Sequence, residues 1–134
     1  MPGVWEAVYT SVIGEATPPS AILDIVRHAR RRNRLNGITG ILLFDGRHLC
    51  QYLEGSRDAV QALLSRIEHD PRHRDLATRH DGAIGERRFG RWSLGYGVDA
   101  EGVIARISAL PGAGIPAALV ELLLQVDLEP GLAF

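Results

Sequence analysis

The sequence predicts an α+β fold in which two amphipathic helices cover one face of a β-sheet. Three observations support this fold class. Strand patterns alternate with helical patterns along the chain, residues 38–44 are apolar enough for a central strand, and a hairpin signal follows them at once. The chain has 134 residues, which is the length of a single domain.

Residues 4–11 form the first expected strand, which places Trp5, Ala7 and Tyr9 on one face. A helix follows, with Ser20 as its expected cap and an end at residues 36–37. Its apolar stripe contains Ile22, Ile25, Val26, Ala29 and Asn33. Asn33 is therefore expected on or beside the buried face of this helix.

The central hairpin joins the apolar strand 38–44 to the alternating strand 47–53 through Asp45-Gly46. The period-two alternation divides the second strand into two sets that face opposite ways. One set is Leu49, Gln51 and Leu53, and the other is His48, Cys50 and Tyr52. Glu54-Gly55 is expected to break the strand.

A second helix is predicted after this break, opened by Ser56 and Asp58 and ended by Asp70-Pro71. Its apolar stripe consists of Val60, Leu63, Leu64 and Ile67. A polar strand is expected at 76–81 and a last strand at 92–98. The resulting order, β-α-β-β-α-β with one added strand, is the ferredoxin-like arrangement with both helices on one sheet face.

The C-terminal part is predicted to contain a Pro/Gly-rich joint at 111–114 and a helix at 116–126 that is apolar almost all round. Such a helix must be covered on more than one side. We expect it to pack on the other sheet face or at a dimer interface. The predicted division is therefore a core at 1–98 and a C-terminal helical extension at 99–134.

The composition excludes several functions. All fifteen positive residues are arginine, which rules out Schiff-base chemistry and the phosphate-binding loop that ends in lysine. The net charge of −1 argues against nucleic acid and membrane surfaces as partners. With Cys50 as the one cysteine and no metal-ligand spacing among the histidines, no metal site is expected. The N-terminus has no secretory leader pattern, so we expect a cytoplasmic protein.

Three polar side chains are at positions where the sequence pattern does not predict exposure to solvent, namely Tyr9, Asn33 and Gln51. A glutamine flanked by leucines at period two is a buried amide, and a buried amide needs partners. Two interpretations remain open. The three residues form a network that fastens helix to sheet, or they bind a planar polar ligand between the two helices. In the basic run, Arg27, Arg30 and Arg31 are expected on a solvated helix end, whereas Arg32 and Arg34 are better placed to meet a ligand.

These residues lie in stretches that resemble the BLUF domains, the sensors of blue light using FAD. The stretches are VYTS at 8–11, NRLNGITGILLF at 33–44, QYLEG at 51–55, RIEHDPRH at 66–73 and FGRWSL at 89–94. Their fixed order over residues 4–98 makes the resemblance specific.

The resemblance implies a flavin held non-covalently between the two helices, as FAD or alternatively as FMN or riboflavin. Tyr9 would be the light-driven electron and proton donor, and Gln51 would rearrange to make a new hydrogen bond to a flavin carbonyl. The other implied flavin contacts are Ile25, Arg32, Asn33, Arg66, Ile67 and Asp70. Trp92 and Leu94 would transmit the signal, although the family usually has methionine where this chain has Leu94.

The function implied is a blue-light receptor without substrate turnover. It would signal to a separate partner protein and form a homo-oligomer, with a dimer expected. Two alternatives are weighed against it. The first is a regulatory or adaptor module that has lost its flavin, and the second is a small phosphatase of similar fold that uses arginine and asparagine.

Overall fold

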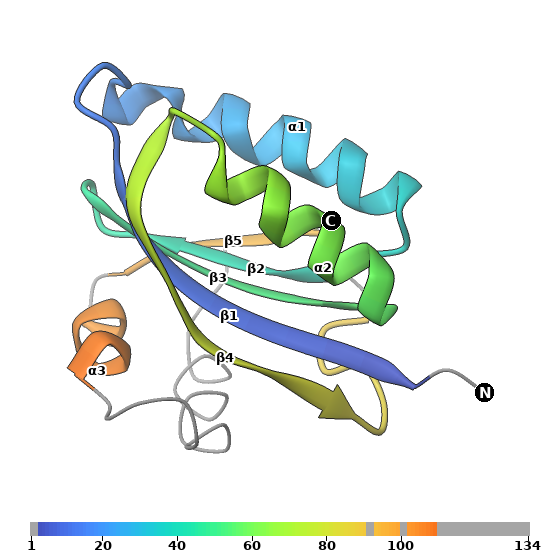
Figure 1. Cartoon of the computed structure of the whole chain (residues 1–134). Helices are drawn as coiled ribbons and strands as arrows, with labels where there is room; N and C mark the ends of the chain where they lie inside the picture. The colour runs from blue at the N-terminus through green and yellow to red at the C-terminus, as the bar shows by residue number, and fades with distance from the viewer. Residues whose placement is uncertain (1–2, 91–92, 100–101, 110–134) are drawn as a thin grey trace.

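The computed structural model describes residues 3–90, 93–99 and 102–109, which form a sheet with helices on both faces (Figure 1). In chain order the elements are β1 (Val4–Ile13), the 3-10 turn η1 (Pro19–Ala21), α1 (Ile22–Leu35), β2 (Thr39–Phe44), β3 (His48–Gly55), α2 (Arg57–Glu68), β4 (His73–Ile84), β5 (Gly95–Val98) and α3 (Val103–Ala109).

The strands are ordered β4-β1-β3-β2-β5 across the sheet. β3 lies between β1 and β2 and runs antiparallel to both, so β1 and β2 are parallel to each other. β4 pairs antiparallel with β1, and β5 adds a parallel edge strand beside β2. This topology confirms the predicted ferredoxin-like arrangement with one added strand.

α1 and α2 lie side by side on one sheet face, as predicted (Figure 1). The buried residues of α1 are Ile22, Val26, Ala29 and Asn33, and those of α2 are Val60, Leu63, Leu64 and Ile67. These residues pack against the strand side chains that alternate toward the same face. The helical spacing of apolar residues therefore identified both packing faces correctly.

The predicted boundaries need correction at the start of α1. Ser20 lies in η1, and Ala21 occupies the cap position without a side-chain hydrogen bond, so Ser20 is not the cap. The end of this helix is as predicted, with Asn36 at its C-terminal cap and Gly37 at a φ of 67°.

The strands also differ from their predicted lengths. β3 continues through Glu54 to Gly55, because Glu54 lies opposite Glu6 on one side and Thr39 on the other and has polar partners there. The polar strand extends over His73–Ile84, and the last strand begins only at Gly95. The predicted break thus fails because Thr39 on β2 and the amides of Arg88 and Phe89 supply hydrogen bonds to the buried carboxylate.

The sequence analysis missed α3, which covers the sheet face opposite α1 and α2 (Figure 1). The Asp99 carboxylate accepts hydrogen bonds from the amides of Val103 and Ile104, which satisfies two donors at the start of this helix. Val103, Ile104 and Ile107 pack there against Val8, Ile41, Leu43, Cys50, Tyr52 and Phe89. The helix expected at 116–126 lies outside the described residues.

Candidate functional site

The helix-covered face holds a tyrosine and a glutamine directly opposite each other. Tyr9 on β1 pairs with Gln51 on β3 in the antiparallel ladder. The Tyr9 hydroxyl donates a hydrogen bond to Gln51 Oε1, and both side chains are buried. Because this acceptor end of the amide is occupied, the amide nitrogen of Gln51 is left to donate to another group.

Burial also sets the protonation state of the tyrosine. Removal from water is the main reason that the pKa of the Tyr9 hydroxyl lies above its ordinary value. The phenol therefore stays protonated at neutral pH and acts as the donor in its bond to Gln51.

A cavity between α1, α2 and the sheet adjoins this pair. Its lining includes seven residues that the sequence analysis singled out: Tyr9, Ile25, Arg32, Gln51, Ile67, Asp70 and Leu94. It also includes five that were not singled out as site residues: Ala29, Leu42, Leu49, Arg72 and His73. Ile25 comes from α1 and Ile67 from α2, so each helix contributes an aliphatic wall.

Charged groups lie at one side of this cavity. Arg72 donates to Asp70 through Nε at 3.0 Å and through Nη2 at 2.6 Å, and these bonds hold the pKa of the Asp70 carboxyl below its ordinary value. Burial and the nearby charges of Arg66 and Arg72 lower the pKa of Arg32, which nonetheless stays charged as arginines do. Arg66 itself is exposed and lies outside the cavity lining, so its positive charge acts there at a distance.

His73 fixes the end of α2 against β1. Its Nε2 lies 2.9 Å from the Ile67 carbonyl, and its Nδ1 lies 2.8 Å from Ser11 Oγ. A carbonyl accepts only, so Nε2 carries the hydrogen and Nδ1 accepts from the serine hydroxyl. Burial lowers the pKa of His73, which favours this neutral form. In the sequence, the only indication that His73 belongs to the site was its position as the last residue of the 66–73 stretch that resembles the family.

Asn33 is fully buried but makes no hydrogen bond to Tyr9 or Gln51 and does not line their cavity. Its Nδ2 donates to the Ser93 carbonyl at 2.7 Å, and its Oδ1 has no hydrogen-bond partner. It lines a neighbouring hollow, together with the exposed Arg34. The structural alternative of a single Tyr-Asn-Gln network is therefore wrong, because two separate sets of contacts take its place.

Of the two residues expected to transmit a signal, the structure describes only Leu94. Trp92 lies outside the described residues. Leu94 is fully buried and lines the cavity, and its carbonyl accepts a hydrogen bond from Arg30 Nε at 2.8 Å. Arg30 is thus half-buried and engaged, which corrects the expectation that it belongs to a solvated helix end.

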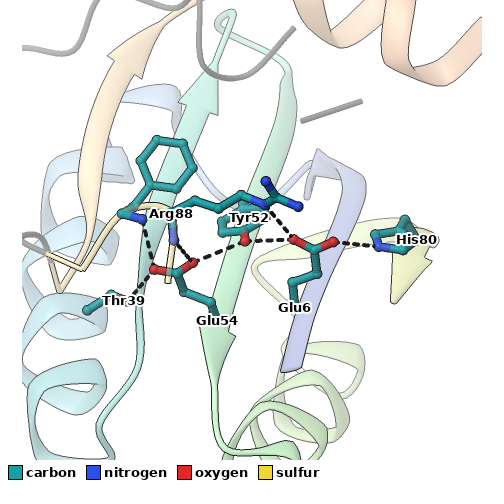
Figure 2. Close-up of polar contacts among 7 residues, drawn as sticks. Glu6, Thr39, Tyr52, Glu54, His80 and Arg88 are labelled. Atoms are coloured by element: carbon teal, nitrogen blue, oxygen red, sulfur yellow. Dashed lines mark hydrogen bonds and ion pairs between the residues drawn. The ribbon is translucent and has the colours of Figure 1, made fainter. Parts of the chain in front are cut away.

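The opposite face of the sheet carries a second polar cluster, drawn in Figure 2. The Tyr52 hydroxyl lies 2.8 Å from Glu6 Oε1 and 3.1 Å from Glu54 Oε1, and both carboxylates are buried. Glu6 also receives bonds from Arg88 and His80. Glu54 receives bonds from the Thr39 hydroxyl and from the amides of Arg88 and Phe89. Every carboxylate oxygen has a donor, so this cluster ties the connection between β4 and β5 to the sheet.

Among the described residues, five buried side-chain atoms have no hydrogen-bond partner, namely Trp5 Nε1, Arg30 Nη2, Arg32 Nε, Asn33 Oδ1 and Ser93 Oγ. Two of them belong to residues that the sequence analysis expected to contact a ligand. Arg32 Nε is a buried donor without an acceptor, and Asn33 Oδ1 is a buried acceptor without a donor. Buried polar atoms are normally paired, so Arg32 Nε, whose residue lines the cavity, is available to donate to a ligand there. A flat heterocycle with a carbonyl, packed between Ile25 and Ile67, has the chemistry that matches Arg32 Nε, whereas Asn33 Oδ1 belongs to the neighbouring hollow.

In residues 3–90, 93–99 and 102–109, no three histidine, cysteine, aspartate or glutamate side chains lie close enough together to hold a metal ion. Of the helices that the structure describes, none combines the length and apolar character needed to cross a bilayer.

Comparison with known proteins gives consistent matches. The family model described as "Sensors of blue-light using FAD" matches residues 4–95. Photoactivated adenylate cyclase subunit beta of Euglena gracilis is 44% identical over 86 residues, which are 61% of this chain and 10% of that protein. The blue light- and temperature-regulated antirepressor BluF of Escherichia coli K12 is 38% identical over 84 residues, 63% of this chain and 21% of the antirepressor. The chain thus spans about a tenth to a fifth of the length of these two relatives.

Among solved structures, the dark state of the BLUF protein BlrB is similar with a TM-score of 0.75 and 33% identity, over 92% of this chain and 93% of that one. The photo-activated state of BlsA has a TM-score of 0.70 and 30% identity, over 76% and 74% of the two chains.

Proposed function

The chain belongs to the BLUF family of blue-light sensors that use FAD, and on that premise we propose that it is a light receptor whose photochemistry runs through Tyr9 and Gln51. The observation that carries the proposal is the hydrogen bond from the Tyr9 hydroxyl to Gln51 Oε1 on the helix-covered face. The family assignment favours the receptor over the phosphatase alternative.

The residues around the cavity fit a flavin. We propose that Ile25 and Ile67 contact the two faces of the ring, because they come from opposing helices and line one cavity. Arg32 Nε can donate to a ring carbonyl. Asn33, which lines the neighbouring hollow, would have to be reached by the edge of the ring for its Oδ1 to accept the ring N–H. Asp70 would lie near the polar edge, with Arg66 contributing charge from outside. The bound flavin supplies the absorption of blue light and the electron acceptor.

The chain's own residues then perform the switching step. With a bound flavin excited, Tyr9 would give up an electron to it, and the phenolic proton would cross along the existing hydrogen bond to Gln51 Oε1. The electron and the proton would afterwards return to Tyr9, so there would be no net oxidation. Gln51 would remain in a changed orientation or tautomer and would offer a different hydrogen bond to the ring. The stored signal is this altered network, which biases its surroundings as a two-state switch requires.

The output is proposed to pass to a separate partner protein, without substrate turnover by this chain. Residues 1–98 would form the flavin-binding core, and residues 99–134 a helical extension that carries the output and a dimer contact. Trp92 and Leu94 would connect the two. We propose FAD as the bound flavin, with FMN or riboflavin as substitutes, and the cytoplasm as the location.

Absorption spectroscopy tests the proposal directly. The purified protein, kept in the dark, is expected to be yellow, to shift its flavin absorption to longer wavelength under blue light, and to recover in the dark. A colourless protein would overturn the receptor and favour a module without flavin. A yellow protein that only bleaches would overturn the hydrogen-bond switch.

A further inference from the structure

Two side chains of α1 hold consecutive carbonyls of the segment before β5. Asn33 Nδ2 donates to the Ser93 carbonyl at 2.7 Å, and Arg30 Nε donates to the Leu94 carbonyl at 2.8 Å. Arg30 and Asn33 are three residues apart, so they lie on the same side of the helix. The segment is therefore fastened at two adjacent points to the helix that lines the cavity.

Arg30 is an unusual residue for such a contact. Its guanidinium is half-buried, with Nη2 buried and unpartnered, while its neighbour Arg31 is exposed. Burial lowers the pKa of Arg30 because it removes water from around the charged guanidinium. A buried carbonyl at Leu94 needs a donor, and the guanidinium supplies one despite that desolvation.

The fastened residue shares a cavity with the photoactive pair. The Leu94 side chain is fully buried and lines the same cavity as Tyr9 and Gln51. Its position along the chain is 64 residues from Arg30, so no local preference holds it there. Displacement of Leu94 would change the packing around Gln51 and admit water to the cavity.

We propose that Arg30 is a positioning residue that holds Leu94 in the flavin cavity through the Leu94 carbonyl. This inference rests on the proposed function, and it goes beyond it by assigning control of the 93–94 segment to a backbone contact. The contact does not depend on which side chain occupies position 94. It is therefore expected to form whether leucine or the family's usual methionine occupies this position.

Three variants of the full chain test the role of the donor. Arg30→Met places carbon at the position of Nε and removes the donor, whereas Arg30→Gln places an amide N–H at the same number of bonds from the backbone. Arg31→Met removes an exposed arginine one residue away. Hydrogen exchange of the peptides covering 93–97 is measured in the dark, together with the flavin absorption maximum.

Arg30→Met is expected to exchange about tenfold faster than wild type in this segment and to shift the dark absorption maximum, because a charge-assisted hydrogen bond is lost. Arg30→Gln should stay within about threefold of wild type, and Arg31→Met should not change. The proposal would be overturned if the segment exchanged at the wild-type rate in Arg30→Met, or if Arg31→Met accelerated its exchange as much as Arg30→Met.

Should Arg30→Met not fold, Arg30→Lys replaces it, since lysine keeps the charge but also has carbon in place of Nε. Faster exchange than in Arg30→Gln is again expected, and a wild-type rate would overturn the role of Arg30. The dark exchange readout needs no photochemistry. A wild-type protein without a red shift would count against the proposed function, while the exchange data still decide the role of Arg30.

Discussion

Both faces of the sheet bury polar side chains, but the two faces differ in how completely these side chains are hydrogen-bonded. On the back face, Glu6, Tyr52 and Glu54 have donors for every carboxylate oxygen, and their contacts hold the connection between β4 and β5. On the helix-covered face, Arg32 Nε and Asn33 Oδ1 have no partner within the described part of the chain. A cluster in which every buried polar atom has a hydrogen-bond partner is typical of a structural role. Buried polar atoms without a partner, beside a cavity, are typical of a ligand site.

The sharpest test of this contrast compares the tyrosines of the two faces. Tyr9→Phe removes the donor to Gln51 and is expected to keep the flavin but abolish the reversible red shift completely. Tyr52→Phe is the matched control, since Tyr52 follows Gln51 directly in the chain but faces the other way. It should keep the red shift and lose about 1–2 kcal/mol of stability in denaturant unfolding. An unchanged shift in Tyr9→Phe would remove Tyr9 as the donor.

The second prediction concerns the structural role of the back face. Glu54→Gln replaces an acceptor-only group with an amide whose NH₂ faces donors from Thr39, Arg88 and Phe89. We expect a loss of about 2–3 kcal/mol in the free energy of unfolding, with the red shift retained. Glu68→Gln, at an exposed position of α2, should change stability by less than about 0.5 kcal/mol. If Glu54→Gln lost the light response but kept its stability, the back face would not have the structural role proposed for it.

The third prediction uses pH. Burial alone would raise the pKa of Glu6, but hydrogen bonds from Tyr52, His80 and Arg88 outweigh it and hold the pKa below 4.5. A carboxyl with a lowered pKa stabilises the fold above its unfolded pKa, and this contribution is lost as the pH falls through the folded pKa. Stability should therefore decline below pH 4.5 through Glu6.

Urea unfolding midpoints measured across this range test the assignment. Glu6→Gln should make the decline shallower, whereas Glu15→Gln, at an exposed site after β1, should leave it as in wild type. The same slope in wild type and Glu6→Gln would show that the cluster does not contribute to acid sensitivity.

The smallest effect is expected for Leu94→Met, which places the family's usual methionine in the cavity. The two side chains have similar volume, so the free energy of unfolding should change by less than about 1.5 kcal/mol. Because methionine is more flexible, the dark recovery rate should change by a few-fold while the red shift stays. A recovery rate identical to wild type would mean that this side chain does not influence the return step.

Part of the site was predictable because its signals are local. Period-two alternation placed Tyr9 and Gln51 on one face, and helical spacing placed Asn33 on the buried side of α1. The order of elements then brought two helices to that face. The same reasoning failed for Glu54, which reads as a strand break, and for α3, whose seven residues give a short pattern.

The sequence by itself determined the fold class, the two packing helices and the face that carries Tyr9 and Gln51. Only the tertiary structure decided that Asn33 bonds to Ser93, that Arg30 holds Leu94, and that His73 joins Ser11 to Ile67. The physical reason is range: alternation and helical spacing act over a few residues, whereas these contacts depend on strand register and helix packing between segments that can lie 60 or more positions apart.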